Sequence, residues 1–142
     1  IMLRTGIVLA KEGGALPKMA KPMLAGVGAP IGDGKQWMSW IDEDDLVNMY
    51  IYALENISLN GAYNAVSPHP CSNQNFTQVL AKVLNRFILL PKIPSFVIRL
   101  LLGEMSIIVL GSTKVSAEKI ISTGFKFNFE KLDESLNKIY HA

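Results

Sequence analysis

A run of acidic residues is the densest group of reactive side chains in this sequence. Asp42, Glu43, Asp44 and Asp45 are consecutive, and carboxylates so close together could bind a metal ion or form a general acid/base pair. The run lacks the alternating ligands and central glycine of a calcium loop. It stands directly before an apolar helical pattern, where carboxylates accept hydrogen bonds from free N–H groups and favour the positive end of the helix dipole. We therefore expect helix capping, with a metal site and a ligand contact as the alternatives.

The segment before these acids carries groups suited to holding a ligand. Residues 32–34 read Gly-Asp-Gly, which indicates a turn, and Gln36 follows with an amide that can donate and accept hydrogen bonds at once. Trp37 and Trp40 are three residues apart and face opposite ways in an extended segment. One indole is expected in the core, and the other is expected to form a flat wall of a substrate cleft.

The remaining candidates for chemistry lack partners. His69 lies between two prolines and His141 is next to last, and neither has a Ser, Asp or Cys at the spacing of a triad or zinc site. Cys71 is the single cysteine, so the chain has no intramolecular disulfide and no thiolate cluster. We expect Cys71 to be a structural thiol beside a helix start. No catalytic nucleophile, base or metal site is predicted.

Apolar periodicity and turn residues predict alternating strands and helices that position these groups. Strands are expected over residues 2–10, 37–41 and 62–66, helices over 15–24, 44–55, 72–86, 116–122 and 132–139, and an extended segment over 125–129. The predicted inner faces are Leu46, Met49, Tyr50, Ala53 and Leu54 in the second helix and Phe76, Val79, Leu80 and Val83 in the third. This alternation is typical of an α/β fold.

Composition limits the partners. The net charge is +2 with scattered Lys and Arg, which argues against nucleic acid. Residues 87–111 are apolar but interrupted by prolines and charges, so no membrane span is predicted. Charged residues make up 18% of the chain against 49% hydrophobic ones, which suggests an apolar surface that normally meets a partner, with homo-oligomers as one possibility. No secretion signal is visible, and a cytoplasmic location is expected.

Several segments carry a family resemblance. Residues 32–47 read G-D-G-K-Q-W-M-S-W-I-D-E-D-D-L-V, which resembles the G-x-G-x-Q-x-R-D-F-I-H-V-x-D segment of extended short-chain dehydrogenase/reductases of the nucleotide-sugar epimerase group. Within that group the chain looks like the "epimerase family" branch, related to nucleoside-diphosphate-sugar epimerases. Residues 4–9 are similar to its R-x-G-x-V-L strand and residues 13–16 to the following loop. Residues 94–96, 99–105 and 124–127 are similar to the branch's C-terminal extension.

The resemblance implies an α/β fold that is the C-terminal part of an extended short-chain dehydrogenase. Residues 1–90 would form its substrate side, with the last Rossmann strands, and residues 91–142 a helical extension. The chain has no G-x-G-x-x-G turn to cradle a pyrophosphate and no Tyr-x-x-x-Lys pair. NAD or NADP would thus be bound mainly by an N-terminal nucleotide domain outside this chain, and the chain alone would be inactive.

The same resemblance assigns roles to residues. Thr5, Gly6 and Ile7 would pass near the nicotinamide end of the cofactor. Arg4, Gln36, Trp37 and Trp40 would contact the substrate, although the position of Arg4 at the start of a buried strand favours the anchoring of a loop. The family's arginine falls at Met38 here, so a bidentate clamp on a substrate diphosphate is not expected.

The implied activity is NAD(P)-dependent epimerisation or reduction of a small, sugar-nucleotide-like substrate. An alternative function is a non-catalytic interaction module that docks through the apolar face of residues 96–110. On that helix Phe96, Leu100 and Gly103 share one side, and Ile98, Leu101, Leu102 and Met105 widen it.

Overall fold

The first strand changes its neighbour half-way along. In the computed structural model, which describes residues 1–89 and 91–141, β1 (Met2–Thr5) pairs in parallel with β5 (Ala62–Ala65), and β2 (Ile7–Leu9) pairs in parallel with β4 (Trp40–Asp42). Gly6 lies between the two halves, and its N–H donates to the Ala65 carbonyl at 3.1 Å. The predicted strand over residues 2–10 is confirmed, and its change of partner opens a space between β4 and β5.

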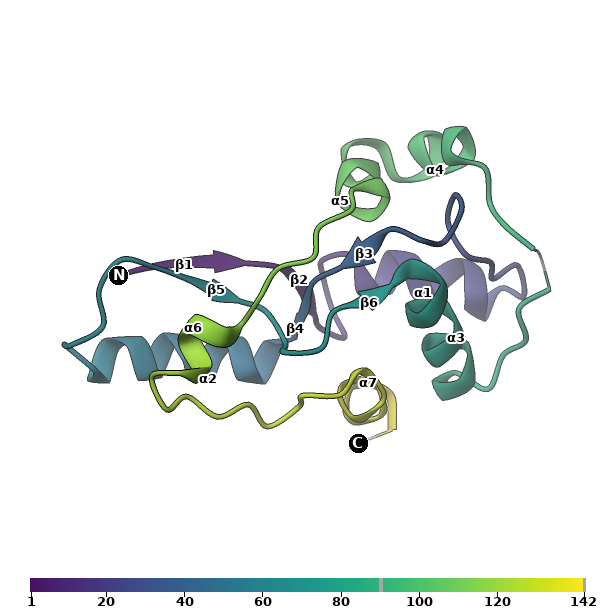
Figure 1. The fold of residues 1–142 in the computed structure, drawn as a ribbon. Coiled ribbons are helices and arrows are strands. Elements are labelled where there is room, and N and C mark those ends of the chain that lie inside the picture. Colours follow the sequence, from purple (N-terminus) through teal and green to yellow (C-terminus); the bar gives the residue numbers. More distant parts are fainter. Residues whose placement is uncertain (90, 142) are drawn as a thin grey trace.

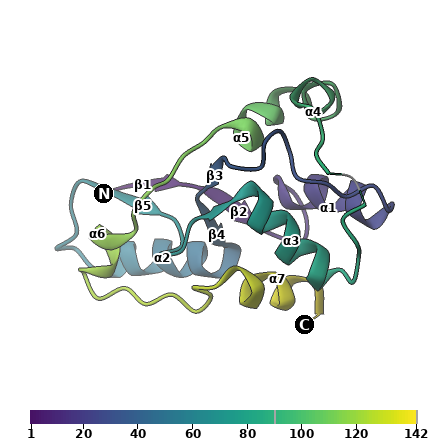
Figure 2. The ribbon, with the colours of Figure 1, turned by 45° about the vertical axis from the view of Figure 1, so that its right-hand side comes forward.

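Helices cover the strands on both sides (Figures 1 and 2). On one side lie α2 (Glu43–Glu55) and α7 (Leu132–His141), and on the opposite side α4 (Ser95–Leu102) and α5 (Ser106–Leu110), joined by the turn η1 (Gly103–Met105). The other elements are α1 (Leu16–Leu24), α3 (Asn73–Val83), α6 (Glu118–Ile121) and the short antiparallel pair of β3 (Trp37–Met38) with β6 (Cys71–Ser72). The predicted α/β class is confirmed.

Two large hydrophobic clusters hold most of these elements together, and C-terminal residues enter both, while a third, small cluster joins Ile31 to Ile98 of α4. One is built from β2, α1, α3 and α7, with Trp40, Phe76 and Leu136 fully buried. The other joins α2 and β5 to Phe125 and Phe127, whose rings meet edge to face at a centroid distance of 5.0 Å. Residues after 91 thus pack into the core formed by the earlier ones. The boundary predicted between residues 1–90 and 91–142 stays a prediction.

The acidic run is a helix cap and an anchor for the tail. Asp42 is the N-cap of α2 and accepts from the Asp44 N–H at 2.9 Å, so the predicted capping is confirmed. Asp42 also accepts from the Ser135 hydroxyl at 2.5 Å and the Lys138 amine at 2.8 Å. Asp45 accepts from the backbone N–H groups of residues 128 and 129. Within the described ranges, no group of three or more His, Cys, Asp or Glu side chains is arranged to hold a metal ion.

The predicted inner face of α2 is wrong at two positions. Tyr50 and Leu54 are 49% and 83% exposed, whereas Asp45 and Met49 are fully buried. A polar residue takes the inner face because both oxygens of Asp45 are needed to hold the backbone of residues 128–129. The exposed side of α2 therefore carries an apolar stripe made of Val47, Tyr50, Ile51 and Leu54.

The helix predicted over residues 116–122 is shorter, since α6 begins at Glu118 with Ala117 as its N-cap. Ser72 caps α3 by accepting from the Asn75 N–H at 3.2 Å, although the helix ends at Val83, before the predicted residue 86. In α4, Phe96 and Leu100 are 73% and 85% exposed and Ile98 is buried. The side chains of Leu101, Leu102 and Met105 lie outside the described part. No helix of residues 1–89 and 91–141 is long and apolar enough to cross a bilayer.

Candidate functional site

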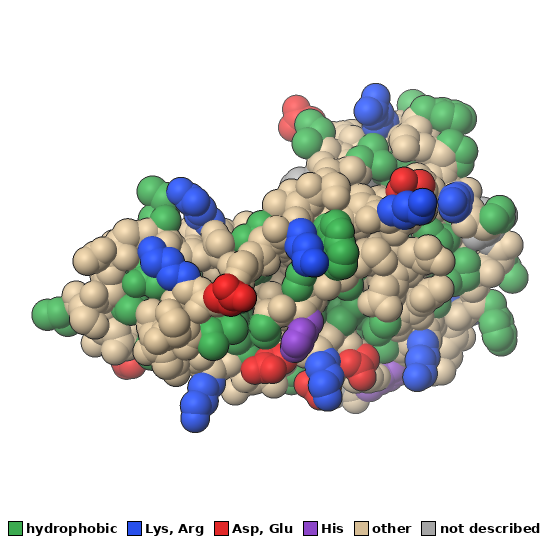
Figure 3. Space-filling model, in the orientation of Figure 1, with side chains coloured by type: hydrophobic (Ala, Val, Ile, Leu, Met, Phe, Trp, Pro, Cys, Tyr) green, Lys and Arg blue, Asp and Glu red, His purple; other side chains and the backbone are tan. Residues whose placement is uncertain are grey.

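A cleft of about 870 Å³ opens where the first strand changes partner. The carboxyl ends of β1 and β5 point into it, which is the place where open α/β sheets bind ligands. Figure 3 shows the hollow between the strands and the α4–α5 pair, with cationic side chains along its edges. The lining comes from Arg4, Thr5, Gly6, Ile7, Val8, Gly14, Ala15, Trp37, Ser39, Asn64, Val66, Ile107, Gly111, Thr113, Lys114, Val115 and Ser116.

Close backbone contact at Gly6 shapes the floor of this cleft. A Cβ at Gly6 would stand 2.5 Å from the Ser39 carbonyl oxygen and 2.7 Å from a methyl group of Val66. The neighbouring Ile7 N–H donates to the same Ser39 oxygen at 2.8 Å. Only a residue without a side chain lets the three segments approach this closely. The Gly6 position is therefore a requirement of the cleft's construction.

Trp37 and Lys114 form one wall. Trp37 is 38% exposed, and the Lys114 amine lies 4.3 Å from its ring centroid, within cation–π range. The segment carrying Lys114 is tied down on both sides. Trp37 exchanges hydrogen bonds with the Ser112 hydroxyl and the Thr113 N–H, at 3.1 Å each. Ser39 donates to the Thr113 carbonyl at 2.7 Å and accepts from the Val115 N–H at 2.9 Å. These bonds hold the lysine over the indole.

The charge of the cleft is one-sided. Among the described residues that line it, Arg4 and Lys114 are cationic and none is Asp or Glu. Cations without facing carboxylates raise the local concentration of anions. The arrangement suits a ligand with a negatively charged group.

Among the described lining residues, Lys114 is the one side chain that commonly acts as a general acid or base. The described lining residues include no His, Cys, Tyr, Asp or Glu. Cys71 is buried elsewhere, and burial raises the pKa of its thiol to about 12, so the thiol stays protonated at neutral pH as the predicted structural role requires. His69 is used through its backbone, whose carbonyl accepts the Trp40 indole N–H at 3.0 Å. Apart from Lys114, a base or acid for chemistry in this cleft would come from outside its described lining.

Two of the seven predicted site residues lie elsewhere. Trp40 is fully buried and has no surface to offer a ligand, so it is the core member of the tryptophan pair. Gln36 donates from its side-chain amide to the Ile31 carbonyl at 3.0 Å and lines a neighbouring open hollow with Lys35 and Arg99. The structure brings together the other five, Arg4, Thr5, Gly6, Ile7 and Trp37.

Sequence reasoning missed Lys114, Ser39 and Ser116. Lys114 belongs to a segment with neither helical nor strand periodicity. The segment is held beside Trp37 by hydrogen bonds such as that between Trp37 and Ser112, which are 75 residues apart in the sequence. Met38, where the family resemblance expects arginine, is buried, and its sulfur accepts a weak hydrogen bond from the Asn73 amide at 3.6 Å. The positive charge beside Trp37 is supplied instead by Lys114.

Comparison with known proteins supplies the family. A model of a domain of unknown function, DUF1731, matches residues 93–139. The "Epimerase family protein SDR39U1 homolog, chloroplastic" of Arabidopsis thaliana is 39% identical over 138 residues, which are 97% of this chain and 40% of the relative. The crystal structure of human epimerase family protein SDR39U1 with NADPH superposes with a TM-score of 0.88 at 33% identity, over 97% of this chain and 47% of that one. The chain is the C-terminal part of an extended epimerase-family protein.

The epimerase-family fold extends to a second solved protein. The nucleoside-diphosphate sugar epimerase of Corynebacterium glutamicum has a TM-score of 0.74 at 25% identity, over 97% of this chain and 25% of that one. The predicted fold, the C-terminal part of a short-chain dehydrogenase-type epimerase, is thereby confirmed. This chain spans less than half the length of each of these relatives. The Arabidopsis relative is named as chloroplastic, and the cytoplasmic location of this protein stays a prediction.

Proposed function

We propose that this chain forms the substrate-binding side of an NAD(P)-dependent epimerase or reductase that acts on an anionic, sugar-nucleotide-like substrate, and that it is inactive by itself. The observation that carries the proposal is the cleft at Gly6, where residues 4–7 and Trp37 meet at the carboxyl ends of two parallel strands. The described lining holds no carboxylate, imidazole, phenol or thiol, which supports a division of labour in which an N-terminal domain supplies most of the catalytic groups.

The residues present fit one end of an NAD or NADP molecule. Thr5, Gly6 and Ile7 line the cleft, and no carboxylate of the described lining would repel the phosphates. Gly14 borders the same space with φ +72° and only the Val8 carbonyl near its missing Cβ, at 3.7 Å. The bound nicotinamide would supply the hydride chemistry. This chain's part is to close the cleft against water and to orient the substrate.

Lys114, Arg4 and Trp37 are the proposed substrate contacts. The Trp37 ring offers a flat apolar surface beside the Lys114 amine, a combination suited to a ring that carries a phosphate or carboxylate. Arg4 extends the positive charge along the strand. Lys114 takes the part that an arginine at position 38 would play, because Met38 is turned into the core.

The test is a cofactor and substrate titration of the full-length natural protein. NADPH fluorescence should change saturably on binding, and turnover of a sugar-nucleotide panel should require both the cofactor and the N-terminal part. A Lys114→Met variant should bind NADPH but raise the substrate KM. No saturable change at millimolar NADPH would count decisively against an oxidoreductase.

One observation favours the alternative function. Phe96 and Leu100 lie one turn apart on α4 and are exposed, as a protein-docking face within residues 96–110 requires. A Phe96→Ser/Leu100→Ser double variant would then abolish partner binding or self-association measured by sedimentation, while leaving NADPH binding intact. Ile57→Ser, at a position 95% exposed, is the matched control.

A further inference from the structure

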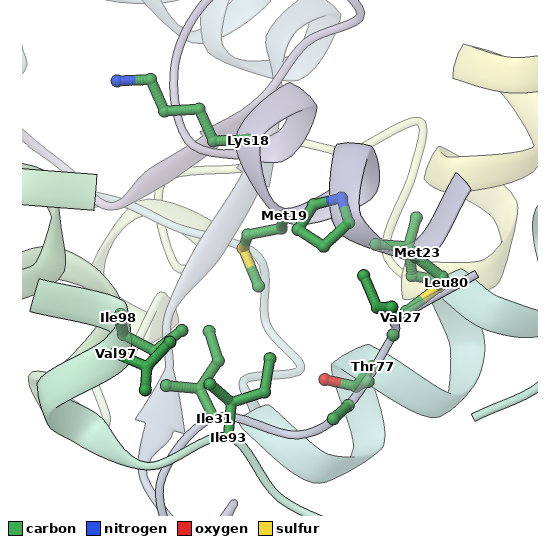
Figure 4. A pocket seen from close by; sticks show the side chains of 13 residues that line it. Lys18, Met19, Met23, Val27, Ile31, Thr77, Leu80, Ile93, Val97 and Ile98 are labelled. Carbon is green, nitrogen blue, oxygen red and sulfur yellow. The ribbon is translucent and has the colours of Figure 1, made fainter. Parts of the chain in front are cut away.

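An apolar pocket of about 250 Å³ lies between α1, α3 and α4 (Figure 4). The side chains of Met19, Ile31, Val97 and Val27 surround it. The complete lining is Lys18, Met19, Pro22, Met23, Val27, Gly28, Ala29, Ile31, Thr77, Leu80, Ile93, Val97 and Ile98.

Polar groups in this lining are few and directed elsewhere. The Lys18 amine extends away from the pocket (Figure 4). The Thr77 hydroxyl, the other polar side-chain group among the lining residues, donates to the Asn73 carbonyl at 2.8 Å. Apolar cavities of roughly 150 Å³ stay dry and bind small hydrocarbons. A space larger than that with such walls therefore favours an apolar occupant over water.

This pocket lies one turn beyond the cleft along α1, and the two described linings have no residue in common. Ala15 lines the cleft and Met19 lines the pocket, and the Met19 N–H donates to the Ala15 carbonyl at 3.0 Å, so the two positions are one helical turn, about 5.4 Å, apart. The α4–α5 pair also contributes to both hollows: Ile107 of α5 lines the cleft, and Val97 of α4 lines the pocket. Met19, on the pocket side of this turn, has a flexible side chain that can adapt to a ligand.

We propose that the two hollows bind one amphipathic substrate, with its anionic part beside Lys114 and Arg4 in the cleft and an apolar tail in the pocket of Met19 and Val97. The inference rests on the proposed function but changes its substrate class, from a sugar-nucleotide-like anion to an anion with an apolar tail. A sugar nucleotide is polar along most of its length and would leave the apolar pocket empty. An anion with an alkyl or similar hydrocarbon tail fills both spaces.

Calorimetry with a homologous series of n-alkyl phosphates tests this directly. The ligands run from ethyl to octyl phosphate, kept below their aggregation concentrations, with inorganic phosphate as the tail-less reference and the full-length protein as receptor. Each added methylene should tighten binding about fourfold until the pocket is full, after which affinity should level off. A series whose affinities do not depend on tail length would overturn the proposal.

Variants at the pocket mouth localise the tail. Val27→Trp, on a loop where Val27 is 50% exposed, should fill the space and remove the tail-length dependence while phosphate binding persists. Val97→Trp, on the opposite wall, provides an independent version should the first fail to fold. Val47→Trp, at a position 55% exposed on α2, is the matched control and should keep the wild-type series. Tail-length dependence that survives in both folded pocket variants would place the tail elsewhere.

A separate variant tests the contact between Lys114 and the phosphate group of these ligands. Lys114→Met should weaken every member of the series by the same factor, about tenfold, without changing its slope. The series requires neither cofactor nor turnover, so its failure is distinct from a failure of NADPH binding. Loss of NADPH binding with the slope intact would refute the oxidoreductase and leave the amphipathic site standing.

Discussion

The carbonyl oxygen of Ser39 stands 2.5 Å from the place where a side chain on Gly6 would begin. That oxygen also accepts the Ile7 N–H at 2.8 Å, so it cannot withdraw without breaking the link between β2 and the segment before β4. The close approach lets the first strand leave β5 and join β4. The cleft exists because of this approach.

Replacing Gly6 with alanine should therefore disturb both stability and binding. The added methyl group meets backbone, which has little room to yield, and the free energy of unfolding should fall by about 1–3 kcal/mol. Urea denaturation measures the change. Thr5→Ala, at the exposed neighbouring position, should stay within about 0.5 kcal/mol of the wild type. A Gly6→Ala protein as stable as the wild type would show that the strands are not held as closely as described.

Substitutions of the two tryptophans should have different effects, one mainly on stability and the other mainly on ligand binding. Trp40→Ala removes a fully buried side chain and should cost about 3–5 kcal/mol of unfolding free energy. Trp37→Ala, at the cleft, should cost less than half as much but weaken anionic-ligand binding. Denaturation curves and ligand titrations on the same pair of variants provide the comparison, and a Trp37 variant with unchanged affinity would remove Trp37 from the site.

Salt and charge should matter at Lys114. The affinity for pyrophosphate should fall about tenfold in Lys114→Met and should become less sensitive to added sodium chloride. Lys126→Met removes the same charge from an exposed position outside the cleft and serves as the control. Equal losses in the two variants would indicate a general charge effect instead of a specific contact.

Lys138 should make stability fall at alkaline pH. Partial burial by itself lowers the pKa of Lys138, but the hydrogen bonds and charges of Asp42 and Asp44 outweigh it and raise the pKa above the ordinary lysine value of 10.5. Because the folded-state pKa is the higher one, this stabilisation is complete below 10.5 and disappears as the pH rises through the raised value. Urea midpoints measured from neutral pH upward should show the loss. In Lys138→Met the difference from the wild type should shrink across that range, and a constant difference would contradict the assignment.

Cys71 should be chemically silent in the folded protein. With its pKa raised to about 12 by burial, the thiolate fraction at neutral pH is on the order of a thousandth of that of an exposed cysteine. An Ellman-type thiol assay should show negligible reaction in buffer and one equivalent of reaction in denaturant. Prompt reaction in buffer would mean that the β6 region opens readily.

Local signals in the sequence were enough to predict most elements. Asp42 and Ser72 were identifiable as helix caps because capping needs only a side-chain oxygen within three residues of a free N–H group. The strand over residues 2–10 was predictable from its apolar run. Its change of partner at Gly6 was not, since that depends on contacts with Ser39 and Val66 far along the chain.

The site was predictable only where it follows a motif. Residues 4–7 and Trp37 lie in the resembling segments and meet in the cleft. Lys114 carries no local signal, and its role arises from hydrogen bonds between distant segments. The inner face of α2 was predicted wrongly for the same reason. The buried Asp45 accepts hydrogen bonds from residues 128–129, and nothing near it in the sequence distinguishes it from a solvent-exposed acid.

Because backbone pairing at Gly6 locates the cleft, its walls can be exchanged without relocating it. A library randomised at Lys114, Trp37 and Ser116 would sample new specificities on an unchanged scaffold. The position of the cleft would thus be set by the backbone, and its specificity by side chains that can change independently.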